Sequence, residues 1–238
     1  MEQQKVILVT GGAQGLGHAI CSALAADHTV IMGDIQEAKA QAAAQAIKAG
    51  KGSVVPVRLD VTDENNVQQV VQQVKKQHGR LDVVINNAGI DVTKPIMELT
   101  VNEWDNVMKV NLRGPFVMAK AALPVMAEQQ GGHIINIVST AALRAWPEAS
   151  VYHATKWGLR GFTHALFTEA RKHNVNVTAV IAGGMKTPFL LDRFPDLDQS
   201  KLQDPVNVAN YIRMIIQGPP ETAVPEIMVI PLQETSWP

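Results

Sequence analysis

Thr10-Gly11-Gly12-Ala13-Gln14-Gly15-Leu16-Gly17 follows the apolar run Lys5–Thr10 and leads directly into Gly15–Asp27, a stretch with helical spacing. A bound phosphate needs backbone N–H groups that point at its oxygens, no Cβ in the way and a helix N-terminus behind them. Glycines at positions 11, 15 and 17 meet these needs at the first strand–helix junction. The stretch therefore predicts a dinucleotide-binding turn, with a glycine-rich turn that binds no ligand as the alternative. The predicted contacts are Gly11, Gln14, Gly15, Leu16 and Gly17.

The rest of the chain alternates between two kinds of segment. Short apolar runs, typical of strands covered on both faces, are Lys5–Thr10, Thr29–Asp34, Ser53–Leu59, Leu81–Asn86, Gly132–Val138, Val175–Ile181 and Glu226–Ile230. Stretches with helical spacing are Gly15–Asp27, Gln36–Ala49, Asp63–Gln77, Thr100–Gln130, Ser150–Asn174 and a last one from Asp204 or Asn207 to near Gly218. This alternation predicts an α/β fold: a single domain over residues 1–238 with a Rossmann-type, doubly wound parallel sheet of about seven strands and helices on both faces.

Local signals refine this prediction at three places. Thr62 is a plausible N-cap for the third helical stretch. The long stretch Thr100–Gln130 is expected to kink or break at Gly114-Pro115 and again at Pro124. Residues 188–204 are irregular and proline-rich, and we expect them to form a small lid over a substrate of modest size.

Composition limits the classes of function. The 238 residues are 46% hydrophobic and 18% charged, as in ordinary globular proteins, and the net charge of −1 gives no reason to expect nucleic acid or a membrane as partner. Cys21 is the single cysteine, which excludes an intrachain disulfide and favours a reducing compartment. The first apolar run is too short for a signal peptide, and no later run suggests a membrane span, so we expect a cytoplasmic protein.

Asp34 ends the second apolar run and bears on the choice of cofactor. A carboxylate there can accept both hydroxyls of an adenosine ribose, and it repels a 2′-phosphate. The alternative is that Asp34 caps the helix that starts near Gln36. Neither Gln14 nor the pair Ile35-Gln36 supplies the positive charge expected for NADP, and Lys39 is expected to be solvated. NAD is therefore favoured over NADP.

Tyr152 and Lys156 are candidates for the chemistry. They are four residues apart in a predicted helix, so both side chains lie on one face. A phenol with its ordinary pKa of about 10 is a poor base at neutral pH. A neighbouring ammonium group and an oxidised nicotinamide would both lower that pKa. Tyr152 could then accept the proton of an alcohol, or donate a proton to a carbonyl oxygen. The alternatives are a packing tyrosine and a surface lysine.

Further motifs occur in order along the chain. Asp60-Val61 follows the third apolar run, and Asn86-Asn87-Ala88-Gly89 follows the fourth. Asn111, Ser139 and Tyr152-His153-Ala154-Thr155-Lys156 come next, and Tyr152 is 13 positions after Ser139. Together with the glycine-rich turn, these motifs resemble those of the short-chain dehydrogenase/reductase family over nearly the whole chain.

The resemblance implies roles for these residues. Lys156 would also hydrogen-bond the nicotinamide ribose, Ser139 would hold the substrate oxygen, and Asn111 would anchor a water that links Lys156 to solvent. For Asn111, a polar plug in a kinked helix is the alternative. The remaining implied cofactor contacts are Asp34, Ile35, Asp60, Val61, Asn87, Ala88, Gly89, Met185 and Thr187, with Tyr152 and Lys156 included. The implied substrate contacts are Ser139, Ala141, Trp146, Tyr152 and Met185.

The chain departs from the family pattern after the sixth strand. Family members usually have Pro-Gly-x-x-x-Thr there, whereas this chain has Ala182-Gly183-Gly184-Met185-Lys186-Thr187. The turn is therefore expected to be less rigid than one fixed by proline.

These observations predict an NAD(H)-dependent oxidoreductase that interconverts a secondary alcohol and a ketone or other carbonyl. The alternatives are a reductase of 3-oxoacyl thioesters on acyl carrier protein or coenzyme A, and an NAD-binding regulator without catalysis. No metal is expected, because the histidines show no ligand spacing. The helical stretches Thr100–Gln130 and Ser150–Asn174 are more apolar than one covered face requires, which favours a homodimer or homotetramer.

Overall fold

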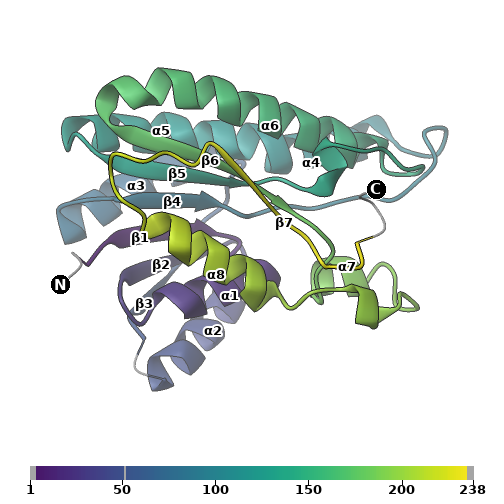
Figure 1. Ribbon diagram of the computed structural model, residues 1–238, viewed down its shortest axis with the longest axis horizontal. Coiled ribbons are helices and arrows are strands. Elements are labelled where there is room, and N and C mark those ends of the chain that lie inside the picture. The colour runs from purple at the N-terminus through teal and green to yellow at the C-terminus, as the bar shows by residue number, and fades with distance from the viewer. Residues whose placement is uncertain (1–3, 51, 235–238) are drawn as a thin grey trace.

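A computed structural model describes residues 4–50 and 52–234, so residues 1–3, 51 and 235–238 of the predicted domain lie outside the described residues. Seven strands form one parallel sheet, which confirms the predicted fold (Figure 1). The strands are β1 (Val6–Thr10), β2 (Thr29–Asp34), β3 (Val54–Arg58), β4 (Val83–Asn86), β5 (Gly132–Ile137), β6 (Val175–Ala182) and β7 (Glu226–Val229).

The strand order is β3-β2-β1-β4-β5-β6-β7, with every neighbouring pair parallel. The chain builds outward from β1 to β3 and then crosses back to place β4 on the other side of β1. Val9 therefore pairs with Met32 on one side and with Ile85 on the other. The carboxyl end of β1 thus lies at the point where the winding direction reverses, where such sheets bind ligands.

Helices cover both faces of the sheet (Figure 1). One face carries α1 (Gly15–Leu24), α2 (Glu37–Ala49) and α8 (Pro205–Ile216). The other carries α3 (Glu64–His78), α4 (Val101–Met108), α5 (Gly114–Glu128) and α6 (Ser150–Ala170). The central strands contribute Ile7, Leu8 and Ile85 to the two apolar layers, and all three are fully buried. The short helix α7 (Pro188–Leu191) stands apart from both layers, beyond the carboxyl ends of the strands.

Of the predicted kink or break at Gly114-Pro115, the break is wrong, because the chain stays helical from Val101 to Glu128. Between α4 and α5 the helix widens into a π-helical segment, Lys109–Arg113. Gly114-Pro115 comes directly after this segment, and the helix continues through it into α5. Pro124 lies inside α5, and the helix continues past it, so the second predicted break is also wrong.

Two smaller predictions need correction. The N-cap of α3 is Asp63, whose carboxylate accepts the N–H groups of Asn65 and Asn66 at 2.9 and 3.1 Å. The hydroxyl of Thr62 donates instead to Asp60. The prediction that every strand is covered on both faces fails for β3, whose side chains are largely half-buried or exposed because it is an edge strand.

Within the described residues, no helix combines the length and apolar character needed to cross a membrane. The same residues contain no group of three or more histidine, cysteine or carboxylate side chains placed to hold a metal ion.

Candidate active site

The glycine-rich turn between β1 and α1 has a backbone that requires glycine. Gly11 and Gly15 have φ values of +65° and +55°, in the left-handed region. A Cβ on Gly17 would lie 2.0 Å from the carbonyl oxygen of Gly11. The side-chain amide of Asn87 donates to the carbonyls of Thr10 and Gly11 at 3.0 Å each, which fixes the turn from the β4 side.

This turn fits the pyrophosphate of a dinucleotide. Gln14 occupies the N-cap of α1 without a side-chain capping bond, so its own side chain leaves the first N–H groups of the helix uncapped. A Cβ built on Gly15 would come into contact with the Thr187 side chain at 3.5 Å. Thr187 is thereby brought to the turn from the far end of β6, as its implied cofactor role requires.

Asp34 lies at the carboxyl end of β2 and is only 5% exposed. Its carboxylate accepts the N–H of Ala13 at 3.0 Å and that of Gln36 at 2.9 Å, so it ties β2 to the glycine-rich turn. The N-cap of α2 is Gln36, and the alternative that Asp34 occupies this position is wrong. Lys39 is not simply solvated, because its ammonium donates to Gln14 Oε1 at 2.5 Å beside the turn.

The other implied adenine and ribose contacts have clear structural partners. The Asp60 carboxylate accepts the N–H and hydroxyl of Thr62, so it shapes the loop after β3. Val61 is buried against Gly114, where a Cβ would approach it to 2.9 Å. Ala88 donates its N–H to the Thr10 hydroxyl at 3.0 Å. Ile35, directly after β2, is 55% exposed. These residues border the carboxyl edge of the sheet around the glycine-rich turn.

Ser139, Tyr152 and Lys156 come together beyond the carboxyl end of β5. The Lys156 ammonium lies 5.5 Å from the centroid of the Tyr152 ring and donates to the carbonyl of Ile137 at 2.8 Å. The Ser139 side chain is close enough to the Tyr152 hydroxyl to lower the pKa of the phenol, and its Oγ accepts the N–H of Ala141 at 3.1 Å. A hydroxyl donor, a second hydroxyl and a buried ammonium group therefore converge at one point.

Burial shifts the pKa values of both Tyr152 and Lys156. It raises the pKa of Tyr152 to about 12, although the Ser139 side chain acts in the opposite direction. It lowers the pKa of Lys156 to about 8. The expected lowering of the Tyr152 pKa by Lys156 is therefore not seen in the protein alone, where loss of hydration outweighs the effects of neighbouring charges. At neutral pH this environment keeps Tyr152 as a protonated phenol.

Asn111 lies in the π-helical segment and is 1% exposed. Its side-chain oxygen accepts the N–H of Ile90 at 2.8 Å, and its amide donates to the Ile90 carbonyl at 2.7 Å. The amide also reaches Thr155 Oγ1 at 3.3 Å, one residue from Lys156. Asn111 therefore joins α6 to the loop after β4. The implied water contact remains a prediction.

Arg193 reaches over this centre from the segment after α7. It forms an ion pair with Asp91, whose side chain is 6% exposed. Its guanidinium stacks on Phe189 at 4.4 Å, and the Phe189 ring lies 5.9 Å from the ring of Tyr152. The Asp91 charge acts on both Tyr152 and Lys156, raising the pKa of each. Sequence reasoning missed Arg193, because nothing local marks a partner 102 residues away.

The proposed substrate contacts fall in different places. Met185 is half-buried in the turn that leads to Thr187. Ala141 is fully buried, and its backbone holds Ser139 and His153. Trp146 packs edge-on against His153, with 4.3 Å between ring centroids, and borders a pocket of about 570 Å³ together with Ile96 and Pro147.

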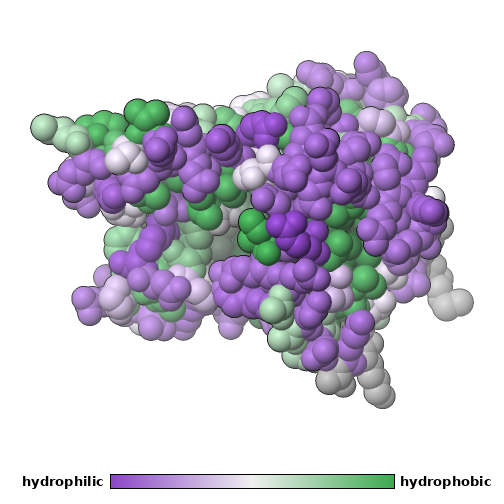
Figure 2. Space-filling view, turned by 180° about the vertical axis from the view of Figure 1, so that it is seen from behind, coloured by the Kyte–Doolittle hydropathy of each residue, from purple (hydrophilic) through white to green (hydrophobic). Residues whose placement is uncertain are grey.

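The surface is hollowed where these elements meet. Figure 2 shows a hollow at its left side, between the lobe that carries α7 and the lobe formed by the loops after β4 and β5. The carboxyl ends of the strands point toward this hollow. Tyr152 on α6 and Arg193 after α7 come from segments that border the hollow. The hollow is therefore the candidate substrate entrance.

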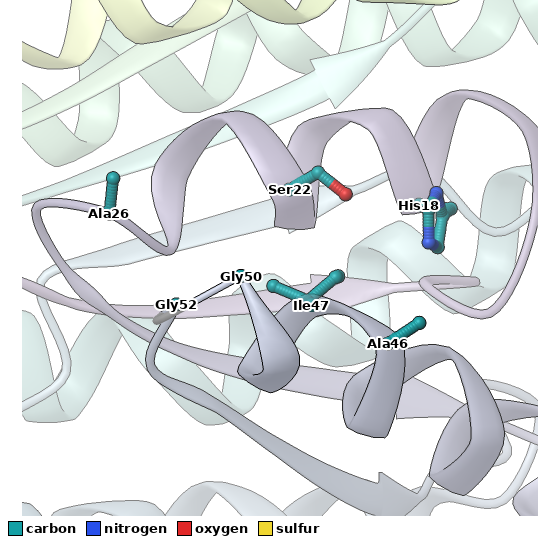
Figure 3. A pocket seen from close by; sticks show the side chains of 7 residues that line it. All are labelled: His18, Ser22, Ala26, Ala46, Ile47, Gly50 and Gly52. Atoms are coloured by element: carbon teal, nitrogen blue, oxygen red, sulfur yellow. The ribbon is translucent and has the colours of Figure 1, made fainter.

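A second pocket, of about 330 Å³, lies between α1 and α2 (Figure 3). His18 and Ser22 line it from α1 and Ile47 from α2, while the two glycines at positions 50 and 52 close it. The described residues that line it include none of Ser139, Tyr152 and Lys156, and His18 is the one titratable side chain among those described. We assign no function to this pocket.

Comparison with known proteins agrees with this geometry. The family model described as short chain dehydrogenase matches residues 5–198. The 3-oxoacyl-[acyl-carrier-protein] reductase FabG of Thermotoga maritima is 31% identical over 98% of this chain and 92% of its own. A crystal structure of a short-chain dehydrogenase/reductase from Burkholderia xenovorans superposes with a TM-score of 0.91 at 30% identity, covering 97% of this chain and 96% of that one. A metagenomic short-chain oxidoreductase in complex with NADP superposes with a TM-score of 0.84 at 28% identity, covering 95% and 96%.

The chain therefore belongs to the short-chain dehydrogenase/reductase family, as its motifs indicated. It is an oxidoreductase whose fold binds a nicotinamide cofactor.

Proposed function

We propose that this enzyme interconverts a secondary alcohol and a ketone or other carbonyl compound, with NAD(H) as the hydride carrier. The convergence of Ser139, Tyr152 and Lys156 at the open edge of the sheet is the observation that carries the proposal. The nicotinamide, when bound, supplies or accepts the hydride. A regulator without catalysis would have no use for this arrangement.

The residues of the chain handle the proton and the oxygen. Ser139 holds the substrate oxygen, and Tyr152 donates its phenolic proton to that oxygen in reduction or accepts a proton from it in oxidation. The Lys156 ammonium, anchored on the Ile137 carbonyl, stabilises the phenolate that forms. Asn111 holds the π-helical segment against Ile90 and so supports the position of α6.

The purified protein should oxidise members of a panel of secondary alcohols with NAD, or reduce ketones with NADH, followed at the NADH absorbance. A panel of 3-oxoacyl thioesters tests the second candidate, which the 31% identity to the Thermotoga reductase favours. Activity on neither panel in the presence of bound cofactor would favour the regulator.

The preference for NAD rests on Asp34. Its buried carboxylate at the end of β2 can accept ribose hydroxyls and would repel a 2′-phosphate. Lys39 acts in the opposite sense, because its ammonium beside Gln14 would attract such a phosphate. A structural relative has been solved in complex with NADP, so NADP is the competing cofactor to test. We expect Asp34 to dominate, because its carboxylate is held by two backbone N–H groups, that of Ala13 in the turn and that of Gln36.

Paired variants test this preference. Asp34→Ala should lower the NAD-to-NADP ratio of kcat/KM at least about tenfold, since juxtaposed like charges cost several kcal/mol. Lys39→Ala should move the same ratio in the other direction. Fluorescence titrations with NADH and NADPH measure binding separately from turnover. An unchanged ratio in Asp34→Ala would refute the assignment of this residue to the ribose.

Residues 188–204 form the lid in this proposal. Phe189 lies against Tyr152, and Arg193 joins this segment to Asp91 on the opposite side of the centre. Closure of such a segment excludes water and completes the site.

Arg193→Gln should lower kcat/KM about tenfold to a hundredfold, because the lid loses its anchor and Asp91 loses its partner. The double variant Asp91→Asn/Arg193→Gln removes the unpaired carboxylate, so it should regain the unfolding free energy lost in the single variant, but not the lost kcat/KM. Chemical denaturation and steady-state kinetics measure the two quantities. Equal kcat/KM in wild type and Arg193→Gln would show that the pair does not serve catalysis.

We propose that the enzyme forms a homotetramer, or at least a homodimer. Phe116 on α5 and Trp157 on α6 are 49% and 51% exposed, unusual for large apolar side chains. Tyr211 and Met214, three residues apart on α8, are 46% and 56% exposed and lie over the other face of the sheet. Two such surfaces would suffice for a closed assembly with two kinds of interface.

We also propose a cytoplasmic location. The single cysteine, Cys21, is fully buried, and burial raises the pKa of its thiol, which makes it inert. A chain whose one thiol is protected in this way needs no oxidising compartment to fold.

A further inference from the structure

The turn after β6 carries Met185 and Thr187, two implied cofactor contacts, in a place where the family usually has proline. The turn is held from one side by backbone bonds. Gly184 accepts the N–H of Gln203 at 3.1 Å, and Lys186 donates to the Gln203 carbonyl at 3.0 Å. Gln203 in turn donates its buried side-chain amide to Val229 at the end of β7. The segment that leads into α8 therefore fixes one side of the turn.

Glu234 holds the other side. After β7 the chain turns back, with the N–H of Glu234 donating to the Pro231 carbonyl at 3.0 Å. This turn points the carboxylate at the β6 exit, where Glu234 Oε2 accepts the N–H of Gly184 at 2.8 Å. A charged acceptor on a backbone N–H makes one of the stronger hydrogen bonds found in proteins.

The glycines of the turn make room for this tail. A Cβ on Gly183 would lie 2.6 Å from Glu234 Oε2, 2.8 Å from Pro231 and 3.0 Å from the Cα of Ile230. The same residue donates its N–H to Val229 at 3.0 Å, which continues the pairing of β6 with β7. The C-terminal segment thus packs directly on the turn, in space that any other residue at position 183 would occupy.

We propose that Glu234 is a positioning residue for the cofactor, which fixes the Gly183–Thr187 turn in place of the missing proline. The inference rests on the proposed function. Its effect reaches the site through Thr187, whose N–H donates to Met185 at 2.9 Å and whose side chain lies against the open face of Gly15. A turn released at Gly184 would no longer hold Thr187 at that place.

Three full-length variants test the role of Glu234. Glu234→Ala should raise the Kd for NADH about tenfold, the equivalent of one charged hydrogen bond. Glu234→Gln retains an oxygen that can accept the Gly184 N–H, so its Kd should stay within about threefold of wild type. Gln233→Ala, at the adjacent exposed position, serves as the control and should match wild type. NADH fluorescence measures Kd directly, and kcat at saturating NADH should change less than KM for NADH.

The outcomes separate this inference from the proposed function. A wild-type protein that binds neither NADH nor NADPH would refute the proposed function itself. Wild-type affinity in Glu234→Ala would overturn the inference and leave the function standing. Equal losses of NADH affinity in Glu234→Ala and Glu234→Gln would also overturn it, because the hydrogen bond accepted from Gly184 would then not explain the affinity. Thermal unfolding of each variant shows whether a loss of affinity accompanies a loss of fold.

Discussion

Tyr152→Phe is expected to lower kcat about a thousandfold in either direction of the reaction, within the range that a positioned general acid or base supplies. The substitution removes one oxygen atom and leaves the ring packed against Phe189. NADH affinity should therefore stay within about twofold of wild type. Single-turnover absorbance at 340 nm and NADH fluorescence measure the two quantities on the same preparation.

The second tyrosine of the chain provides the control. Tyr211 is exposed on α8, so Tyr211→Phe also removes a hydroxyl but far from the catalytic group. It should leave kcat unchanged. If Tyr152→Phe retained turnover comparable to that of Tyr211→Phe, the phenol would have no part in proton transfer, and the mechanism proposed here would be wrong.

The two shifted pKa values predict how carbonyl reduction depends on pH. Tyr152, with its pKa raised to about 12, stays protonated and able to donate across the neutral range. Lys156, with its pKa lowered to about 8, is charged below that pH and loses its charge as pH rises through it. Reduction should therefore decline above pH about 8. Lys156→Arg keeps its charge at all accessible pH values, so the rate that remains in this variant should lack the decline near pH 8.

Sequence patterns predicted the parts of this protein that depend on neighbours along the chain. The strand–helix alternation gave the sheet because each apolar run and each turn is a local signal. The spacing of Tyr152 and Lys156 placed both on one helix face for the same reason. The π-helical segment was not predictable in this way. Asn111, in this widened part of the helix, hydrogen-bonds Ile90, which is 21 residues away in the sequence. The sequence showed only Gly114-Pro115 nearby, which favoured a break.

The missed residues all act at long range. Arg193 pairs with Asp91 across 102 positions, and Glu234 reaches Gly184 across 50. No periodicity or capping rule links such positions, and only the folded chain shows that they meet. The direction of the Tyr152 pKa shift was missed for a related reason. Burial depends on how Phe189 and the surrounding elements pack, whereas the sequence shows only the charge four residues away.

Gly17→Ala should abolish cofactor binding, raising the Kd for NADH more than about a hundredfold. The added Cβ would lie 2.0 Å from the Gly11 carbonyl oxygen and 2.6 Å from Asn87 Nδ2, and the first of these is backbone that no side-chain rotation can move. Either α1 or the glycine-rich turn must shift, and a shift of about 1 Å is enough to misalign N–H groups aimed at a phosphate. The overpacking should also lower the free energy of unfolding by about 1–3 kcal/mol.

Gly131→Ala is the matched control for this prediction, because a Cβ at position 131 would meet nothing within 4 Å and Gly131 does not have a left-handed φ. It should bind NADH like wild type and unfold at the same or a slightly higher denaturant concentration. NADH fluorescence and urea denaturation of the two variants then separate two effects. One is the loss of affinity or stability that any replacement of glycine brings, and the other is the loss that arises only at the turn. Tight NADH binding by Gly17→Ala would mean that the cofactor phosphates lie elsewhere, and the assignment of Gly11, Gly15 and Thr187 would fail with it. Loss of binding in a variant that remains folded would instead tie the pyrophosphate to the N-terminus of α1, since that helix end is what the added methyl group displaces.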